Sequence, residues 1–361
     1  MRKDARDFLH SLLTTPSPSG FEPAIQRVVK KRIQASADSV TVDVHGNLIA
    51  ALNPEGPVRV MLAGHCDQIG MMITHIDDHG YLWFQQIGGL DPSVLPGTEV
   101  IVLTPNGRVP GVLGQKAVHL KTQAERGQKT ELKKLWIDIG AADGKAAKKL
   151  VSVGDVAVFA PRVTALADHR ISAAGCDDRV GVFVVMEAFR LVAEALKKRG
   201  KSSSFPVALF AVSTVQEELG LRGARTAAYG IDPLVGIAVD VTHSSDNPGG
   251  EAKQTGTVKL GEGPTIARGA NMNPELETLL RDTAKAKRIP FQPLGVAGAT
   301  GTDANAMQIN RKGVAAALVG VPNRYMHTPV EVVDIRDLEA ASKLIAETVL
   351  KITKRMTFVP V

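Results

Sequence analysis

The chain has 361 residues, of which 44% are hydrophobic and 22% charged, and its formal net charge is +6. This length predicts two domains, or one large domain with an insertion, and the composition is typical of a soluble globular protein. The only two cysteines, Cys66 and Cys176, exclude a disulfide-stapled secreted scaffold and a multi-cysteine zinc ribbon.

The first thirteen residues have a basic start but lack the apolar stretch of a signal peptide, because Asp4, Asp7 and His10 interrupt it. They predict an amphipathic helix instead. No run reaches the ~18 apolar residues that a membrane span needs. Aromatic residues make up only 4% of the chain, so we interpret its scattered basic clusters as solvated helix faces and not as a nucleic-acid surface. We expect a cytoplasmic protein with no membrane or nucleic-acid partner.

Apolar residues at helical spacing predict a helix over 8–13 and, after a Pro/Ser/Gly loop at 16–20, a second helix over 25–33. Ser19 and Glu22 have the spacing of a capping box before the second helix. Strand-like runs follow at 40–44, 48–52 and 58–63.

From about 71 to 162, short alternating runs are separated by turn sequences, which predicts antiparallel sheet or a small barrel with one helix near 143–150. After Ala167, long helices alternate with apolar strands, the pattern of βα units on a parallel sheet. We therefore predict an α/β fold: a mostly parallel sheet with helices on both faces, formed by residues 1–70 and 167–361 and interrupted by a small β domain at 71–166.

Potential metal ligands recur directly after apolar strands. His65 and Asp67 follow the strand at 58–63, Glu217 and Glu218 the strand at 207–215, Asp240 the strand at 234–239, and His327 the strand at 314–321, while Asp177 and Asp178 stand where a long helix begins. Because ligand sites of open parallel sheets form beyond the carboxyl ends of the strands, we expect these side chains to meet. Taken singly, each has a structural explanation, such as a helix cap at Asp177-Asp178 or a solvated loop at Glu217-Glu218.

Two imidazoles and three carboxylates are enough for two divalent ions that share a bridging carboxylate. Zinc or cobalt suits these nitrogen and oxygen ligands best, and manganese is also suitable. Such a pair of ions polarises a carbonyl and activates water. Asp67 lies two residues from His65 and faces the same side of a strand, so it can orient the imidazole. Of Glu217 and Glu218, one can bind metal while the other contacts the water.

Three segments carry a family resemblance: 64–70 (GHCDQIG), 175–181 (GCDDRVG) and 216–224 (QEELGLRGA), with shorter matches around Asp240, Asp303 and His327. They resemble the TET-type aminopeptidases, peptidase family forty-two of the metallo class, also described as glutamyl aminopeptidase or "cellulase M". The order of the segments and the inserted β domain match as well, so the resemblance covers nearly the whole chain.

The resemblance implies a two-metal aminopeptidase that removes N-terminal residues from short peptides. His65, Asp177 and Asp240 would hold one ion and Asp177, Glu218 and His327 the other, with Asp177 as the bridge, Glu217 as general base and Asp67 as the residue that orients His65. The insertion would be a PDZ-like dimerisation domain, and dimers would assemble into a dodecamer. Gln68 departs from the family, whose members usually carry an acid there, and Cys66 replaces a Met or similar residue.

Other functions remain open on the residues alone. A deacylase or carboxypeptidase could use the same two metals, and a glycosidase is suggested by the "cellulase" label, although glycosidases typically use a metal-free pair of carboxylates. A non-enzymatic basic binding module would account for the net charge of +6. The loop at 295–303 is the candidate wall of the substrate pocket, but its sequence does not identify the preferred N-terminal residue.

Overall fold

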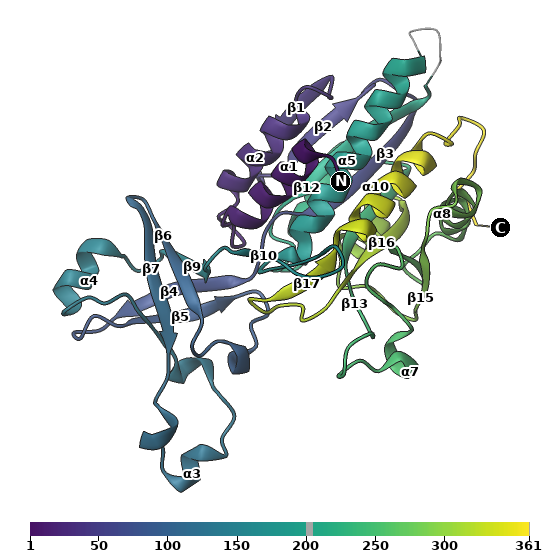
Figure 1. The fold of residues 1–361 in the computed structure, drawn as a ribbon. Coiled ribbons are helices and arrows are strands. Elements are labelled where there is room, and N and C mark those ends of the chain that lie inside the picture. The colour runs from purple at the N-terminus through teal and green to yellow at the C-terminus, as the bar shows by residue number, and fades with distance from the viewer. Residues whose placement is uncertain (200–204, 361) are drawn as a thin grey trace.

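An eight-stranded mixed sheet forms the centre of the molecule (Figure 1). The computed structural model describes residues 1–199 and 205–360. In spatial order the strands are β1 (Ser39–Val42), β2 (Leu48–Leu52), β12 (Val207–Thr214), β3 (Val58–His65), β13 (Val235–His243), β16 (Ala315–Asn323), β14 (Thr265–Gly269) and β15 (Gln292–Val296). The four central strands from β12 to β16 are mutually parallel.

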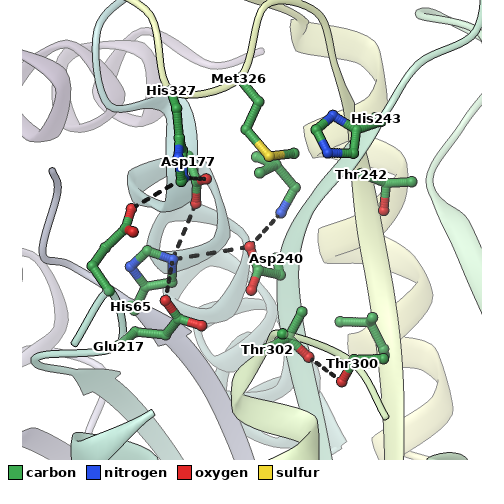
Figure 2. Close-up of a pocket in the computed structure, with 14 residues that line it drawn as sticks. His65, Asp177, Glu217, Asp240, Thr242, His243, Thr300, Thr302, Met326 and His327 are labelled. Carbon is green, nitrogen blue, oxygen red and sulfur yellow. Dashed lines mark hydrogen bonds and ion pairs between the residues drawn. The ribbon is translucent and has the colours of Figure 1, made fainter. Parts of the chain in front are cut away.

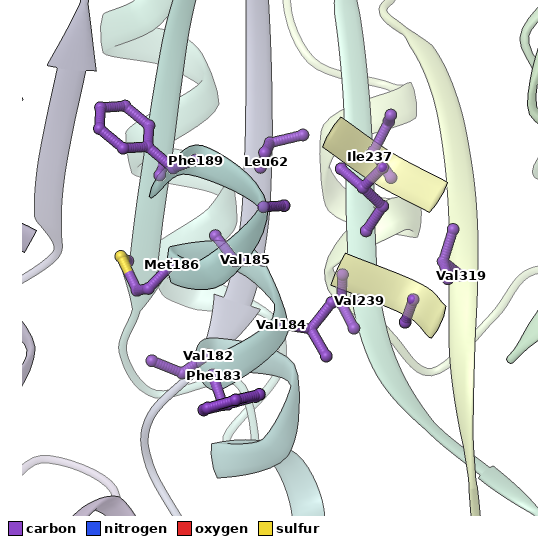
Figure 3. Packing of buried hydrophobic residues seen from close by; sticks show 14 of the residues in the cluster. Leu62, Val182, Phe183, Val184, Val185, Met186, Phe189, Ile237, Val239 and Val319 are labelled. Carbon is purple, nitrogen blue, oxygen red and sulfur yellow. The ribbon is translucent and has the colours of Figure 1, made fainter. Parts of the chain in front are cut away.

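Helices cover both faces of this sheet, which confirms the predicted fold class. One face packs against α1 (Lys3–Thr14), α2 (Pro23–Ile33), α5 (Cys176–Arg199), α8 (Pro274–Lys287) and α10 (Ile335–Val349), and the other against α6 (Arg222–Ile231) and α9 (Asp303–Gln308). Strand alternation divides the two cores: Val60 and Leu62 of β3 join the first, whereas Met61 and Ala63 join the second. Figure 3 shows α5 packed over the first face, with Leu62, Ile237 and Val239 beneath it.

A glycine in β3 lets α5 approach the sheet closely. A Cβ on Gly64 of β3 would lie 2.7 Å from the backbone carbon of Gly181 in α5. A side chain at Gly64 would therefore push the helix away from the sheet and carry Asp177, at the start of α5, away from His65.

The inserted segment forms a closed barrel whose strand order is β4, β5, β8, β7, β6, β9. Its strands are β4 (Gly70–Ile76), β5 (Leu82–Ile87), β6 (Glu99–Thr104), β7 (Gly107–Gly114), β8 (Trp136–Asp138) and β9 (Val156–Phe159). All its paired strands are antiparallel, and the barrel has a hydrophobic core of its own. In Figure 1 it projects from one end of the α/β body.

Short elements complete the fold. In the barrel region these are η1 (Pro92–Val94), η2 (Val118–Leu120), α3 (Gln123–Arg126), η3 (Leu132–Lys134) and α4 (Gly144–Leu150), and outside it α7 (Ala252–Thr255). A three-stranded antiparallel sheet, β10 (Val163–Ala165), β11 (Arg170–Ala173) and β17 (Glu331–Asp334), lies next to the site described below. Among the described residues, no helix is both long enough and apolar enough to cross a membrane.

The capping box predicted at the start of α2 is wrong. Ser19 does not cap the helix; its hydroxyl donates to Asp67 Oδ2 at 2.6 Å. Glu22 instead accepts the backbone N–H of Gly20 at 2.7 Å and that of Gln216 at 3.3 Å. Both side chains of the expected box are thus used to support the functional site.

Candidate active site

The parallel register brings the predicted ligands to one edge of the sheet. His65 ends β3 and pairs in register with Thr214, the last residue of β12. The β13–β3 pairing matches Ala238 to Ala63, so Asp240 lies beside His65 two residues further on. The turn after β16 brings His327 back over the same edge, where it meets Asp177 from the start of α5 (Figure 2).

Asp177 lies between the two imidazoles. Its Oδ1 is 3.1 Å from His65 Nε2 and its Oδ2 is 3.1 Å from His327 Nε2. Each carboxylate oxygen therefore faces a different histidine, which is the arrangement that a bridging ligand between two cations requires. Asp177 is almost fully buried, and despite the opposing effect of burial its hydrogen bonds with the two histidines hold its pKa below the ordinary value.

Two sets of potential ligand atoms converge in the described chain. Atoms of His65, Asp178 and Asp240 lie within 4.8 Å of one another, and so do atoms of Asp177, Glu218 and His327. The second set matches the expected ligands of one ion. The first set contains Asp178 and not the expected Asp177, although Asp177 Oδ1 lies 3.1 Å from His65 Nε2.

Asp178 is the unexpected member of the first set. Its Oδ1 accepts the backbone N–H of Gly181 at 3.0 Å, as a helix cap does, and its Oδ2 accepts the backbone N–H of His65 at 3.2 Å. Both Asp178 oxygens are thus used by backbone N–H groups, whereas the two Asp177 oxygens face the imidazoles of two candidate ligands. Asp178 instead ties the start of α5 to the end of β3.

Asp67 lies on the other side of His65. Its backbone carbonyl oxygen is 3.1 Å from His65 Nδ1 and its Oδ1 is 3.6 Å away, so either oxygen can fix the orientation of the ring. Asp67 also accepts the backbone N–H groups of Glu217 at 3.0 Å and Glu218 at 3.2 Å. Although burial opposes it, these contacts hold the pKa of Asp67 below its ordinary value.

The structure distinguishes the two adjacent glutamates. Glu218 Oε1 is 3.5 Å from His327 Nε2 and belongs to the second ligand set. Glu217 belongs to neither set; its Oε2 is 3.7 Å from His65 Nε2, and its buried Oε1 has no hydrogen-bond partner. Glu218 is therefore positioned as a ligand, and Glu217 as a carboxylate with one oxygen free for a proton.

Burial and mutual repulsion make it unfavourable for all the carboxylates of this cluster to be ionised when no cation is present. Burial raises the pKa of Glu217 to about 10 and that of Glu218 to about 7, and it raises the pKa of Asp240 as well. The hydrogen bond with Asp177 raises the pKa of His327 to about 9. Buried carboxylates that resist ionisation together are stabilised by a cation, so the donor set fits divalent metal ions that prefer nitrogen and oxygen ligands.

A cavity of about 380 Å³ opens over the cluster. The candidate ligands and Glu217 form part of its lining. The remaining lining has no Asp, Glu, Lys or Arg among the described residues, and consists of Val241, Thr242, His243, Thr300, Gly301, Thr302, Leu318 and Met326. Part of the loop at 295–303 thus forms a wall, as expected, and Asn271 fixes that wall by accepting hydrogen bonds from Thr300 N (3.0 Å) and Oγ1 (2.6 Å).

Glu331 is a supporting residue that was not identified from the sequence. Its buried carboxylate accepts the backbone N–H of Asp177 at 3.0 Å through Oε2 and that of His327 at 2.8 Å through Oε1. The signal was present in the sequence, because an acid opens the otherwise apolar run Glu331-Val332-Val333. A buried acid that begins an apolar strand needs partners, and here they are two candidate ligands.

The fold and this site define an α/β protein with a mostly parallel sheet and a buried histidine–carboxylate centre at the sheet edge. Residues 46–344 match the family model described as M42 glutamyl aminopeptidase. The lysyl aminopeptidase of Pyrococcus furiosus is 38% identical over 98% of this chain and 99% of its own length. The TET aminopeptidase of Thaumarchaeota archaeon SCGC AB-539-E09 has a TM-score of 0.90 at 31% identity, covering 98% of both chains.

A third similar protein is the Pyrococcus horikoshii TET1 peptidase, which can assemble into a tetrahedron or a large octahedral shell. Its TM-score is 0.84 at 32% identity, over 96% of this chain and 100% of that one. The chain belongs to the M42 aminopeptidase family, as its sequence motifs suggested. It is therefore an aminopeptidase, a hydrolase of peptide bonds.

Proposed function

We propose that the protein removes N-terminal residues from short peptides with two divalent ions per subunit, zinc or cobalt in the first place and manganese as an alternative. His65, Asp177 and Asp240 hold one ion, and Asp177, Glu218 and His327 hold the other. The observation that carries the proposal is the position of Asp177, whose two oxygens each lie 3.1 Å from a different imidazole.

When bound, the two ions supply Lewis-acid polarisation of the peptide carbonyl and a water molecule of lowered pKa. The chain's own residues do the rest. Glu217 takes the proton from the attacking water on its unpartnered Oε1 and then delivers it to the leaving amine nitrogen. Asp67 keeps His65 in one orientation, and the bonds from the Glu217 and Glu218 backbone to Asp67 keep both glutamates next to it.

The neutral part of the cavity indicates which N-terminal side chains fit. Leu318, Met326 and Val241 are apolar, while Thr242, Thr300 and Thr302 add hydroxyl groups. The lining contains no lysine or arginine to neutralise an acidic side chain, and its acids all belong to the ligand and base cluster. We therefore expect preference for an uncharged N-terminal residue, in spite of the glutamyl and lysyl names of relatives.

Two further parts of the proposal concern the whole protein. The barrel segment 71–166 acts as a dimerisation domain, and dimers assemble into a closed dodecamer; support comes from the tetrahedral assembly of the TET1 relative. A cytoplasmic location remains a prediction. The alternatives of a deacylase, a carboxypeptidase or a glycosidase on this site are separated from aminopeptidase activity by the substrates they accept.

The decisive experiment compares substrates after chelation and reconstitution with each metal. Peptides with a free N-terminus should be hydrolysed, and leucyl and methionyl fluorogenic substrates should exceed glutamyl and lysyl ones. The same peptides with an acetylated N-terminus, and cello-oligosaccharides, should not react. Turnover of acetylated peptides would favour a deacylase or carboxypeptidase, and the absence of any response to added metal would contradict the two-ion site.

A further inference from the structure

The barrel reaches the site through one tight turn, Gly88-Gly89, which directly follows β5. A Cβ built on Gly89 would lie 3.2 Å from His327 Nδ1 and 3.3 Å from His327 Cε1. A Cβ on Gly88 would lie 3.2 Å from Glu218 Oε2 and 2.8 Å from Ile69 Cγ2. The absence of a side chain at these two positions therefore leaves room for two of the three residues of the second ligand set, and a methyl group at either position would crowd them.

His327 depends on such packing for its orientation. It follows a turn in which both Tyr325 and His327 itself have left-handed backbone conformations, with φ of 62° and 63°. Its backbone N–H is held by Glu331 and its Nε2 faces Asp177. Within the described part of the chain, no hydrogen bond holds Nδ1, the ring atom nearest to where a Cβ on Gly89 would lie. The space left by the missing side chain at Gly89 is therefore occupied by this edge of the ring.

The turn is itself firmly supported. Leu90, the next residue, is buried in the barrel core together with Ile69, which leads from the Asp67 segment into β4. The barrel core thus fixes the turn from behind while Gly88 and Gly89 face the ligands. A segment fixed in this way helps to keep the His327 imidazole and the Glu218 carboxylate at the observed distance of 3.5 Å.

We propose that Gly88-Gly89 is a positioning element for the cation bound by Asp177, Glu218 and His327. This inference rests on the proposed two-ion function. The turn excludes side-chain atoms from one side of His327 and Glu218, so that both ligands keep the orientation in which their donor atoms converge. The other ligand set, around His65 and Asp240, does not touch the turn and is independent of it.

The test uses Gly89→Ala, with Gly127→Ala as its matched control in the same barrel region. Neither glycine has a positive φ, so alanine causes no backbone strain, and a Cβ on Gly127 has no atom within 4 Å. Cobalt binding is followed by calorimetry and by visible absorption of the protein reconstituted from the metal-free form. Thermal unfolding of the metal-free variants measures any change of fold stability separately.

Wild type and Gly127→Ala should each bind two cobalt ions. Gly89→Ala should bind one of them at least ~10-fold more weakly, the size typical of lost support behind a metal ligand, and the other within about twofold of wild type. In a double-mutant cycle, Gly89→Ala should add no further loss to His327→Ala, because its effect acts through that ring.

Equal weakening of both ions, unchanged binding, or an additive loss in the His327→Ala background would overturn the positioning role. Gly89→Ala could also lower the stability of the metal-free protein. The double-mutant cycle still distinguishes the two explanations, because a purely structural defect would weaken cobalt binding in the His327→Ala background as well. Failure of the wild type to bind two ions would instead overturn the proposed function on which the inference rests.

Discussion

Glu331 accepts the backbone N–H of His327 at 2.8 Å, and the second oxygen of the same carboxylate accepts the N–H of Asp177 at 3.0 Å. One buried side chain thereby fixes the main chain of two candidate ligands that come from a helix start and from a loop 150 residues later in the chain. Because both backbone positions are held by the same carboxylate, the Cα atoms of Asp177 and His327 keep a defined spacing, and their side chains can meet at 3.1 Å.

Replacing Glu331 with Gln should disturb this arrangement, because the amide nitrogen is a donor and would face one of the two N–H groups. Leaving a buried N–H unpaired costs about 1–3 kcal/mol. We expect unfolding free energy to fall by that amount and metal affinity to fall about 10–100-fold, as for other residues that support ligands. Calorimetric metal titration and denaturant unfolding measure the two effects. Glu262→Gln on the exposed surface is the control and should change neither.

Glu217→Gln should separate catalysis from metal binding. Glu217 lies outside both ligand sets, so two ions should remain bound, whereas kcat should fall by about 10²–10⁴, the usual contribution of a general base. Glu218→Gln is the matched comparison, because its carboxylate belongs to a ligand set and its loss should reduce metal content. Metal analysis and peptide turnover on the same preparations provide the readout. An active Glu217→Gln enzyme would refute the assigned role.

Gln68→Glu should stabilise the protein. Arg179 is almost fully buried, its Nε has no partner, and no carboxylate of the described residues lies within ion-pair distance of it. Gln68 Oε1 is also buried without a partner, and both side chains border Gly175: a Cβ there would be 3.1 Å from Arg179 Nη1 and 3.5 Å from Gln68 Cβ. Glutamate would give the guanidinium a charged acceptor, worth about 1.5–3 kcal/mol.

Denaturant unfolding at pH 7 checks this gain, and Gln68→Met, which removes the oxygen without adding charge, should show no stabilisation. A Glu variant less stable than wild type would mean that the neighbouring Asp67 and Glu22 repel the added charge more than Arg179 attracts it. The position is the one at which family members were expected to carry an acid.

Asp246 and Arg324 predict a pH dependence of stability. Asp246 accepts Arg324 Nε at 2.9 Å and Nη2 at 2.7 Å, and anchors the turn that leads to His327. Burial opposes ionisation, but the bonds from Arg324 and from the Leu260 N–H hold the pKa of Asp246 below its ordinary value. Because the folded pKa lies below the unfolded one, the stabilisation is present above pH ~4 and is lost as the pH falls further.

Asp246→Asn should therefore cost about 0.5–1 kcal/mol at pH 5–8, a modest value because the side chains keep 16–17% of their surface exposed and the Asn amide oxygen can still accept a bond from Arg324. The difference from wild type should shrink as the pH is lowered below 4. Urea unfolding of both proteins at pH 7 and pH 3 measures it, and a difference that grows at low pH would contradict the assignment.

The sequence by itself determined the main strands and helices, and it predicted that the candidate catalytic residues lie at the carboxyl ends of the parallel strands. Apolar runs fixed the strands β3, β12, β13 and β16, and since the ends of parallel strands meet, the residues His65, Glu217, Glu218, Asp240 and His327 were predicted together. The two cysteines, each next to a candidate ligand, are fully buried. These features depend on local periodicity, which a single chain displays directly.

Only the tertiary structure shows where neighbouring side chains of the candidate site lie; their roles were predicted from the family resemblance and remain proposals. Local spacing does not distinguish Glu217 from Glu218 or Asp177 from Asp178, because loop conformation sets their directions; Gln216, for instance, has a left-handed φ of 54°. The bond from Ser19 to Asp67, the bond from Asp177 to Glu331 and the approach of Gly89 to His327 join positions 48, 154 and 238 residues apart. Such contacts between distant residues form only when the sheet, the helices and the barrel pack together. Local sequence patterns therefore do not predict them.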